Sequence, residues 1–136
     1  MAQQSPLRFF KRCHIHCERR DLFKRNWREI LGISEGVRGL YVLYKKRNGS
    51  KTMFDPVYVG VGGVKREWGV GARLQWHARN RKGWTHFSIF EAHDNVSATE
   101  ILEMESFLLQ IFGRDSRPKL QNRQVGSKAF AAISGK

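Results

Sequence analysis

Two short apolar segments separated by a polar turn dominate the hydrophobic pattern of the chain. Residues 39–46 and residues 57–62 are rich in β-branched and aromatic side chains, with Tyr41 in the first segment and Tyr58 in the second. The turn between them contains an Asn-Gly pair, and two such segments joined through Asn-Gly are typical of an antiparallel hairpin. We therefore expect Tyr41 and Tyr58 to lie close together on paired strands.

The first apolar segment has hydrophobic side chains on both of its faces, which favours a central strand covered on each side. Three glycines lie at the end of the second segment, and we expect their small size to leave room for a large ligand to approach the backbone. They are Gly60, Gly62 and Gly63. Residues 84–92 have the pattern of a third strand.

Two helices are predicted downstream of the hairpin. Residues 70–80 carry apolar side chains at helical spacing. Residues 97–112 begin with a capping box, Ser97 followed by Glu100, and Gly113 is expected to end this helix.

The N-terminal part of the chain is basic and also carries apolar side chains at helical spacing. We expect residues 8–35 to be helical, with Asp21 as an N-cap and Gly32 just past the helix end. The basic face of such a helix is either an ordinary solvated surface or an arm that follows a nucleic-acid backbone.

The order hairpin, helix, strand, helix predicts an α+β fold. We expect a small, mainly antiparallel three-stranded sheet flanked by helices, with an extra N-terminal helical segment. The chain then divides into a basic helical extension (residues 1–36), a core (residues 37–125) and a basic C-terminal tail (residues 126–136).

Charge is the part of the composition that changes this picture. The 136 residues include 25 Lys and Arg against 12 Asp and Glu, a formal net charge of +13. Such an excess favours a polyanionic partner: DNA, RNA or an anionic membrane surface. No apolar run approaches the ~20 residues of a membrane span, and no signal-peptide core precedes Arg8. We expect a cytoplasmic protein without a disulfide framework, because the chain has only two cysteines.

Four potential metal ligands crowd into five positions near the N-terminus. They are Cys13, His14, His16 and Cys17. Structural zinc sites usually take ligand pairs from two separated segments, and no second cysteine pair exists. A metal site is one interpretation; we favour ordinary thiols and imidazoles on a turn of helix.

One carboxylate in the helix predicted over residues 97–112 lies where an apolar side chain is expected. A rotation of about 100° per residue places Glu105 inside the apolar arc around Ile101, Leu108 and Phe112. A carboxylate on the core-facing side is costly unless it is paired. Glu105 is therefore either half of a structural ion pair with a neighbouring arginine or a metal ligand held on a rigid helix.

Arg73 and His77 lie one turn apart at the border of the apolar stripe of the helix predicted over residues 70–80. Taken singly, each is an ordinary surface or half-buried residue. As a pair at the margin of the core they are candidates for binding a phosphate and moving a proton. The arginine suits a phosphate because its fork donates to two oxygens at once.

Together these residues resemble the GIY-YIG nuclease family. Five family elements occur in the family's order: two tyrosine tripeptides, an arginine followed by a histidine on the first core helix, an acid on a later helix, and a late asparagine. The matching residues are Gly39-Leu40-Tyr41, Tyr58-Val59-Gly60, Arg73, His77, Glu105 and Asn122. The resemblance covers roughly residues 37–125. On its own, Asn122 reads as an ordinary turn residue.

The resemblance implies a divalent-metal-dependent endonuclease that hydrolyses DNA phosphodiester bonds and needs no other cofactor. It implies Glu105 as the ligand of Mg²⁺ or Mn²⁺, since hard cations take oxygen ligands. Arg73 would hold the scissile phosphate while negative charge builds on it.

The remaining roles implied by the resemblance concern protons and orientation. Tyr41 would be the general base for the attacking water, with His77 assisting or substituting. Tyr58 would hydrogen-bond to the phosphate or orient the water. Asn122 would brace the acidic end of the site.

Further basic side chains are expected to contact the DNA backbone without reading its sequence. They are Lys65, Arg66, Arg79, Arg81, Lys82, Arg117, Lys119 and Arg123. Two other functions fit the same charge: a nucleic-acid-binding module without catalysis, and a basic adaptor whose polar residues form a structural network. The sequence leaves open the DNA specificity, the choice among restriction, repair, resolvase and mobile-element roles, and the oligomeric state.

Overall fold

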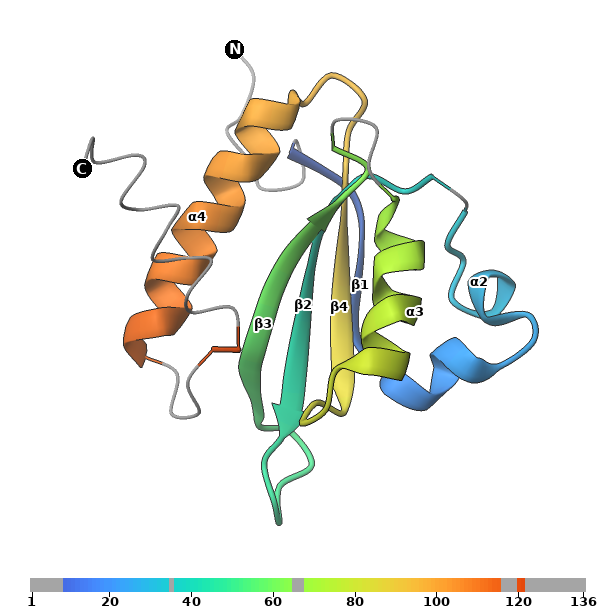
Figure 1. The fold of residues 1–136 in the computed structure, drawn as a ribbon, viewed down its shortest axis with the longest axis vertical. Helices are drawn as coiled ribbons and strands as arrows, with labels where there is room; N and C mark the ends of the chain where they lie inside the picture. Colours follow the sequence, from blue (N-terminus) through green and yellow to red (C-terminus); the bar gives the residue numbers. More distant parts are fainter. Residues whose placement is uncertain (1–8, 35, 65–67, 116–119, 122–136) are drawn as a thin grey trace.

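A four-stranded antiparallel sheet with helices on both faces organises the part of the chain that the structure describes (Figure 1). The computed structural model describes residues 9–34, 36–64, 68–115 and 120–121. The elements are β1 (Phe10–Glu18), the 3₁₀ helix η1 (Arg19–Phe23), α2 (Trp27–Ile30), β2 (Gly39–Lys46), β3 (Phe54–Gly62), α3 (Val70–Asn80), β4 (His86–Ala92) and α4 (Ala98–Asp115). The strand order is β1-β4-β2-β3. The predicted α+β class is confirmed, with four strands in place of three.

The two faces of the sheet bury different sets of side chains. On one face Tyr41 and Leu43 pack with residues of α3, η1 and α2. On the other face Leu40 and Val42 pack with residues of α4. Figure 1 shows α4 on one side of the strands and α3 on the other. β2 lies between β4 and β3, so its apolar composition on both faces is that of a central strand, as predicted.

The predicted hairpin is formed by β2 and β3. Its register pairs Tyr41 with Gly60 and Leu43 with Tyr58. Gly49, in the turn, has a φ of +77°, a conformation that glycine adopts without strain. The hairpin therefore brings the two tyrosines together, and their ring centroids are 6.1 Å apart.

The expected N-terminal helix over residues 8–35 is wrong. Most of the first half of that segment is β1, which pairs with β4 from Phe10 opposite Ala92 to Glu18 opposite His86. Two irregularities interrupt the pairing, and His16 has a φ of +56° in the second of them. These bulges break the alternation by which a strand is recognised in a sequence.

The apolar residues that suggested a helix have other roles. Leu22 and Trp27 are buried in the core beneath α3, whereas Phe23 and Ile30 are exposed. They lie in η1 and in the single-turn helix α2, and Asp21 lies inside η1 instead of capping a helix. The described part of residues 1–36 thus belongs to the same core as the rest of the sheet. Residues 126–136 lie outside the described part.

Gly32 follows the end of α2 with a φ of +67°, which agrees with the predicted helix-ending role. The predicted capping box is also present, because Glu100 N–H donates to Ser97 Oγ at 3.1 Å and Ser97 N–H donates to Glu100 Oε1 at 3.0 Å. Gly113, however, does not end α4, which continues to Asp115. Glycine lowers helix stability but does not by itself forbid a helix.

The helix α3 has the predicted bounds, and Val70, Leu74 and Ala78 form its buried stripe. The strand β4 begins two residues later than predicted, since Trp84 turns into the core before the strand starts. No helix among the described residues combines the length and apolar character that a membrane crossing requires.

Candidate active site

The side chains expected at the site converge on Tyr41. The Tyr41 hydroxyl lies 2.8 Å from Nε2 of His77, and the Tyr58 ring stacks beside the Tyr41 ring. Arg73 and Glu105 are both close enough to shift the pKa of Tyr41. Two phenols and an imidazole therefore meet at one place, and a guanidinium from α3 and a carboxylate from α4 lie close enough to act on the Tyr41 hydroxyl through their charges. The sixth expected residue, Asn122, lies outside the described residues.

Close packing of backbone and ring at the glycines holds this cluster together. A Cβ at Gly60 would overlap the ring and hydroxyl of Tyr41, and a Cβ at Gly62 would overlap the backbone of Val70 at the start of α3. The space beside these two glycines is thus filled by the protein itself. The expectation that they leave room for a ligand is wrong, because their role is to admit Tyr41 and α3.

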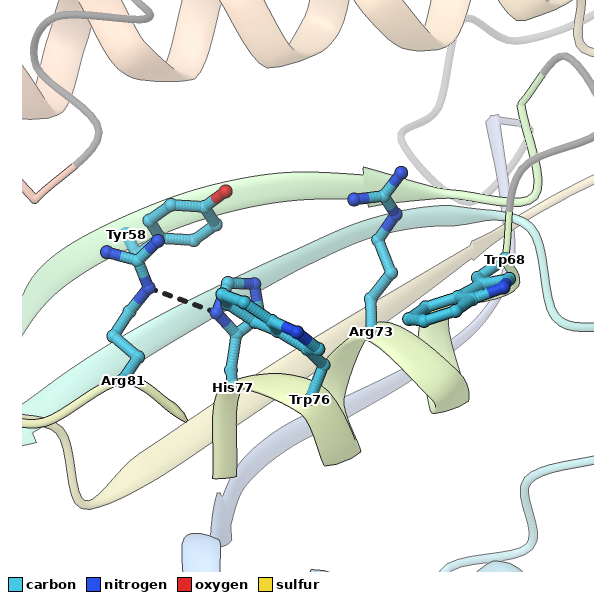
Figure 2. Close-up of a pocket in the computed structure, with 6 residues that line it drawn as sticks. All are labelled: Tyr58, Trp68, Arg73, Trp76, His77 and Arg81. Atoms are coloured by element: carbon cyan, nitrogen blue, oxygen red, sulfur yellow. Dashed lines mark hydrogen bonds between the residues drawn. The ribbon is translucent and has the colours of Figure 1, made fainter. Parts of the chain in front are cut away.

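The helix α3 presents Arg73 and His77 to the strands while its apolar stripe enters the core. Leu74 is fully buried, and His77, one turn after Arg73, is only 3% exposed. The guanidinium of Arg73 extends away from α3 toward the side of the sheet along which α4 runs (Figure 2).

A hollow of about 280 Å³ opens over the cluster. We call it the Tyr58 hollow; Figure 2 shows the side chains that line it, which are Tyr58, Trp68, Arg73, Trp76, His77 and Arg81. Tyr58 is the phenol that meets the hollow, whereas Tyr41 is 1% exposed and lies behind it. The guanidinium carbon of Arg81 lies 4.1 Å from the centroid of the Tyr58 ring, within the range of a cation–π contact.

Arg81 determines where His77 carries its proton. Nε of Arg81 donates to Nδ1 of His77 at 3.0 Å (Figure 2). Arginine has no acceptor and stays protonated, so Nδ1 must be the acceptor of this bond. The neutral ring therefore carries its proton on Nε2, which donates to the Tyr41 oxygen.

The same environment keeps His77 neutral. Burial, followed by the positive charges of Arg81 and Arg73, lowers the pKa of His77 to about 4. The imidazole is thus uncharged near pH 7, with one nitrogen accepting from Arg81 and the other donating to Tyr41. It is built to stabilise an oxygen at Tyr41 and not to accept a proton from it.

Burial is the largest influence on Tyr41 and raises the pKa of its hydroxyl well above the ordinary value. Tyr58 raises the pKa further, Arg73 lowers it, and the Glu105 carboxylate raises it. Tyr41 therefore keeps its proton at neutral pH in the ligand-free protein. Added positive charge near the phenol would favour the phenolate.

Glu105 is an acidic side chain of α4 whose charge acts on Tyr41, and it is partly buried, as the apolar arc predicted. Within the described residues no three His, Cys, Asp or Glu side chains are arranged to hold a metal by themselves. Mg²⁺ at phosphate-processing sites is nonetheless commonly bound by one or two carboxylates, with water and phosphate oxygens completing the shell. Glu105 suits such a site as a single protein ligand.

The cysteine and histidine cluster near the N-terminus lies on the edge strand β1 and not on a helix. Cys13 is exposed, and the His16 ring stacks on Phe54 with centroids 4.2 Å apart. Burial raises the pKa of both thiols, Cys13 and Cys17. Among the residues the structure describes, these four form no metal-binding group.

Three of the eight expected backbone-contacting cations are described. Arg79 and Lys82 are exposed, and Arg81 lines the Tyr58 hollow, where it also donates to Gln121 Oε1 at 3.0 Å. The other five lie outside the described residues: Lys65, Arg66, Arg117, Lys119 and Arg123.

The residues at the hollow that sequence reasoning missed are Trp68 and Trp76. Trp68 is 62% exposed and Trp76 is 46% exposed, beside the predicted Arg73. A signal was available, because position 76 falls outside the apolar stripe of the predicted helix and a tryptophan there must face solvent.

Comparison with protein-family models, with curated proteins and with solved structures finds no match for this chain.

Proposed function

We propose that the protein is a divalent-metal-dependent endonuclease that hydrolyses DNA phosphodiester bonds by chemistry of the GIY-YIG type. The observation that carries the proposal is the convergence on Tyr41 of a second phenol, an imidazole, a guanidinium and a carboxylate. The formal net charge of +13 agrees with a polyanionic substrate.

Phosphodiester hydrolysis makes a bond from a water oxygen to phosphorus and breaks the bond from phosphorus to one sugar oxygen. One proton must leave the water, and one must reach the departing oxygen. Negative charge builds on the non-bridging oxygens as these bonds change. Arg73, whose guanidinium lines the Tyr58 hollow, donates to two of those oxygens and holds the phosphate there.

In the proposed mechanism Tyr41 first loses its own proton to solvent and, as phenolate, takes the proton from the attacking water, while the departing sugar oxygen takes a proton from solvent. The Nε2–H group of His77 donates a hydrogen bond to the Tyr41 oxygen and so stabilises the phenolate form. Because Nδ1 of His77 accepts from Arg81, His77 assists Tyr41 and does not replace it as the base. Tyr58, which meets the hollow directly, hydrogen-bonds to the phosphate or orients the water.

Glu105 would hold Mg²⁺ or Mn²⁺ as the single protein ligand among the described residues. When bound, the ion supplies positive charge that neutralises the phosphate and lowers the pKa of nearby acids, including Tyr41. Arg73 acts in the same direction on the pKa of Tyr41, whereas burial opposes both.

The test is nicking of supercoiled plasmid in the presence of Mg²⁺ by the wild-type protein and two variants. Glu105→Gln should reduce the rate at least about 100-fold, as loss of several kcal/mol of transition-state stabilisation requires. Glu103→Gln, an exposed position on the same helix, should cleave like the wild type. Equal cleavage by Glu105→Gln would remove Glu105 from the proposed role.

A second candidate is a nucleic-acid-binding module that does not cleave. The observation in its favour is the burial of Tyr41, which raises the pKa of the proposed base. A gel shift of DNA without cleavage in either Mg²⁺ or Mn²⁺ would select this candidate over the enzyme. A basic adaptor is distinguished from both by Arg73→Ala, which should then unfold the chain in a thermal melt.

A further inference from the structure

A second hollow adjoins the Tyr58 hollow, and two tryptophans belong to the walls of both. It has a volume of about 240 Å³, and we call it the Gln75 hollow. Its lining residues are Arg28, Trp68, Ala72, Gln75, Trp76, Arg79 and Asn80. Figure 2 shows Trp68 and Trp76 on either side of Arg73, at the rim of the Tyr58 hollow. A ligand that enters the Gln75 hollow thus lies next to the proposed phosphate site.

The shared wall is aromatic and exposed. Trp68 and Trp76 are among the most exposed large hydrophobic side chains of the described residues. The Trp76 ring meets the buried His77 ring edge-on, with centroids 5.2 Å apart and planes at 86°. Because Trp76 stays 46% exposed despite this contact, part of its indole is available to a ligand. Exposed indoles beside a cationic groove are the usual platform on which bases of a single strand stack.

Two amides line the Gln75 hollow, and each donates a hydrogen bond to a main-chain carbonyl. Nε2 of Gln75 donates to the carbonyl oxygen of Leu22 at 3.1 Å, and Nδ2 of Asn80 donates to the carbonyl oxygen of Trp76 at 2.9 Å. Because each amide nitrogen bonds to a main-chain carbonyl, the oxygen of the same amide points away from that carbonyl. Such oxygens accept hydrogen bonds from the N–H groups of a nucleobase edge.

The rim of the same hollow is positively charged. Arg79 is exposed, and the guanidinium carbon of Arg28 lies 5.3 Å from the centroid of Trp27. Aromatic faces, amide oxygens and guanidinium groups together match the three parts of a nucleotide: the base faces, the base edge and the phosphate.

We propose that the Gln75 hollow is a nucleobase subsite. It takes an unpaired base of the strand whose phosphate lies against Arg73, and the base stacks on the wall formed by Trp68 and Trp76. The inference rests on the proposed function for the position of the phosphate, and it adds a substrate class. DNA with an unstacked nucleotide beside the scissile phosphate binds better than a continuous duplex, because its base is already free to leave the stack.

The test measures binding by the otherwise intact chain carrying Glu105→Gln, so that the probes are not cut. Three short DNA duplexes differ only at one central position: fully paired, a one-nucleotide bulge, and the same bulge with an abasic residue. The base-containing bulge should bind about 10-fold or more tighter than the abasic bulge, as the stacking of one base provides. Binding of the base should also change the intrinsic tryptophan fluorescence.

Variants assign the preference to the tryptophans. Trp68→Leu and Trp76→Leu should reduce the difference between the two bulges, and Trp76→Phe should restore most of it, because phenylalanine keeps an aromatic face. Both positions are exposed, so a thermal melt should match that of the parent. Phe107→Leu, which removes an exposed ring from α4, is the matched control and should leave the difference unchanged.

Equal affinity for the base-containing and abasic bulges would overturn the subsite even where plasmid is cleaved. A difference that survives both Trp→Leu substitutions would overturn it as well, and so would the absence of binding to all three probes. Conversely, base-dependent binding in a protein that cleaves no DNA would overturn the proposed nuclease function and leave the base site standing. The failures of the two proposals are therefore separable.

Discussion

The ring of Tyr41 occupies the space into which a side chain at Gly60 would project. The two residues face each other in the register of β2 and β3, and a Cβ at position 60 would overlap both the Tyr41 hydroxyl and the ring carbon that bears it. The hydroxyl that approaches His77 at 2.8 Å is therefore positioned by the absence of a side chain on the neighbouring strand.

Gly60→Ala should displace the Tyr41 ring and weaken both the fold and the site. We expect a loss of about 1–3 kcal/mol in the free energy of unfolding, the usual cost of overpacking a core. A urea titration measures this loss, and plasmid nicking should fall with it. Gly113→Ala is the control: its Cβ enters open space on a helix, and we expect a gain of about 0.5–1 kcal/mol. Unchanged stability of Gly60→Ala would show that the ring has room to move.

Tyr41→Phe and Tyr44→Phe form a matched pair. Each removes one phenol hydroxyl whose oxygen accepts a hydrogen bond, from Nε2 of His77 at 2.8 Å for Tyr41 and from Oγ of Ser88 at 3.0 Å for Tyr44. We expect both to lower the free energy of unfolding by about 1–2 kcal/mol. Only Tyr41→Phe should abolish nicking, because only that hydroxyl belongs to the proposed base. Full activity of Tyr41→Phe would assign the proton transfer to another group.

The pH dependence of stability should report the buried neutral His77. Its pKa falls from 6.5 to about 4 on folding. Between pH 6.5 and about pH 4 the His77 ring binds a proton in the unfolded chain but not in the folded protein. The free energy of unfolding therefore decreases as the pH falls through this range and recovers as the pH rises. His77 should contribute a loss of about 1 kcal/mol between about pH 7 and about pH 5.5.

Two measurements check the His77 prediction. An NMR titration of the His77 ring should show the neutral form throughout the range in which exposed histidines protonate. Urea titrations of wild type and His77→Gln at the two pH values should differ in their pH slopes, since glutamine does not titrate. Identical slopes would mean that the ring protonates in the folded state.

Arg81→Met should remove the hydrogen bond that determines which ring nitrogen of His77 carries the proton. Loss of the positive charge and of the bond to Nδ1 should raise the pKa of His77 above about 4, although burial should keep it below 6.5. Nicking should weaken, because the ring then has two tautomers and only one donates to Tyr41. Arg25→Met, an exposed arginine that lines neither hollow, is the control for net charge. Equal effects of the two substitutions would reduce the role of Arg81 to general electrostatics.

Local patterns predicted the parts of the fold that depend on neighbours along the chain. The Asn-Gly turn fixed the hairpin, and helical spacing of Val70, Leu74 and Ala78 fixed α3 with its bounds. The position of Glu105 inside an apolar arc also followed from helical geometry, and its side chain is partly buried. These features follow from local backbone and side-chain periodicity, which a sequence displays directly.

Long-range contacts account for what the sequence did not predict. β1 is held by β4 and by an ion pair from Arg12 Nε to Glu91 Oε1 at 2.7 Å, and its bulges hide the alternation that marks a strand. The assignment of the His77 proton depends on Arg81, which the sequence analysis suggested only as a contact to the DNA backbone. The pairing of β1 has no signature in local spacing, and the contact between His77 and Arg81, although only four residues apart, depends on how both side chains turn toward the sheet.

The place of β1 in the sheet has a consequence for how the protein is made. Its partner strand follows it by most of the chain, with His14 opposite Ile89, whereas β2, β3 and α3 are consecutive. During synthesis on a ribosome, β2, β3 and α3 can assemble before β4, the pairing partner of β1, has been synthesised. The nascent polypeptide must therefore carry an unpaired edge until β4 emerges, and the exposed charges of Lys11 and Arg12 are suited to keeping that edge from pairing with other chains during the delay.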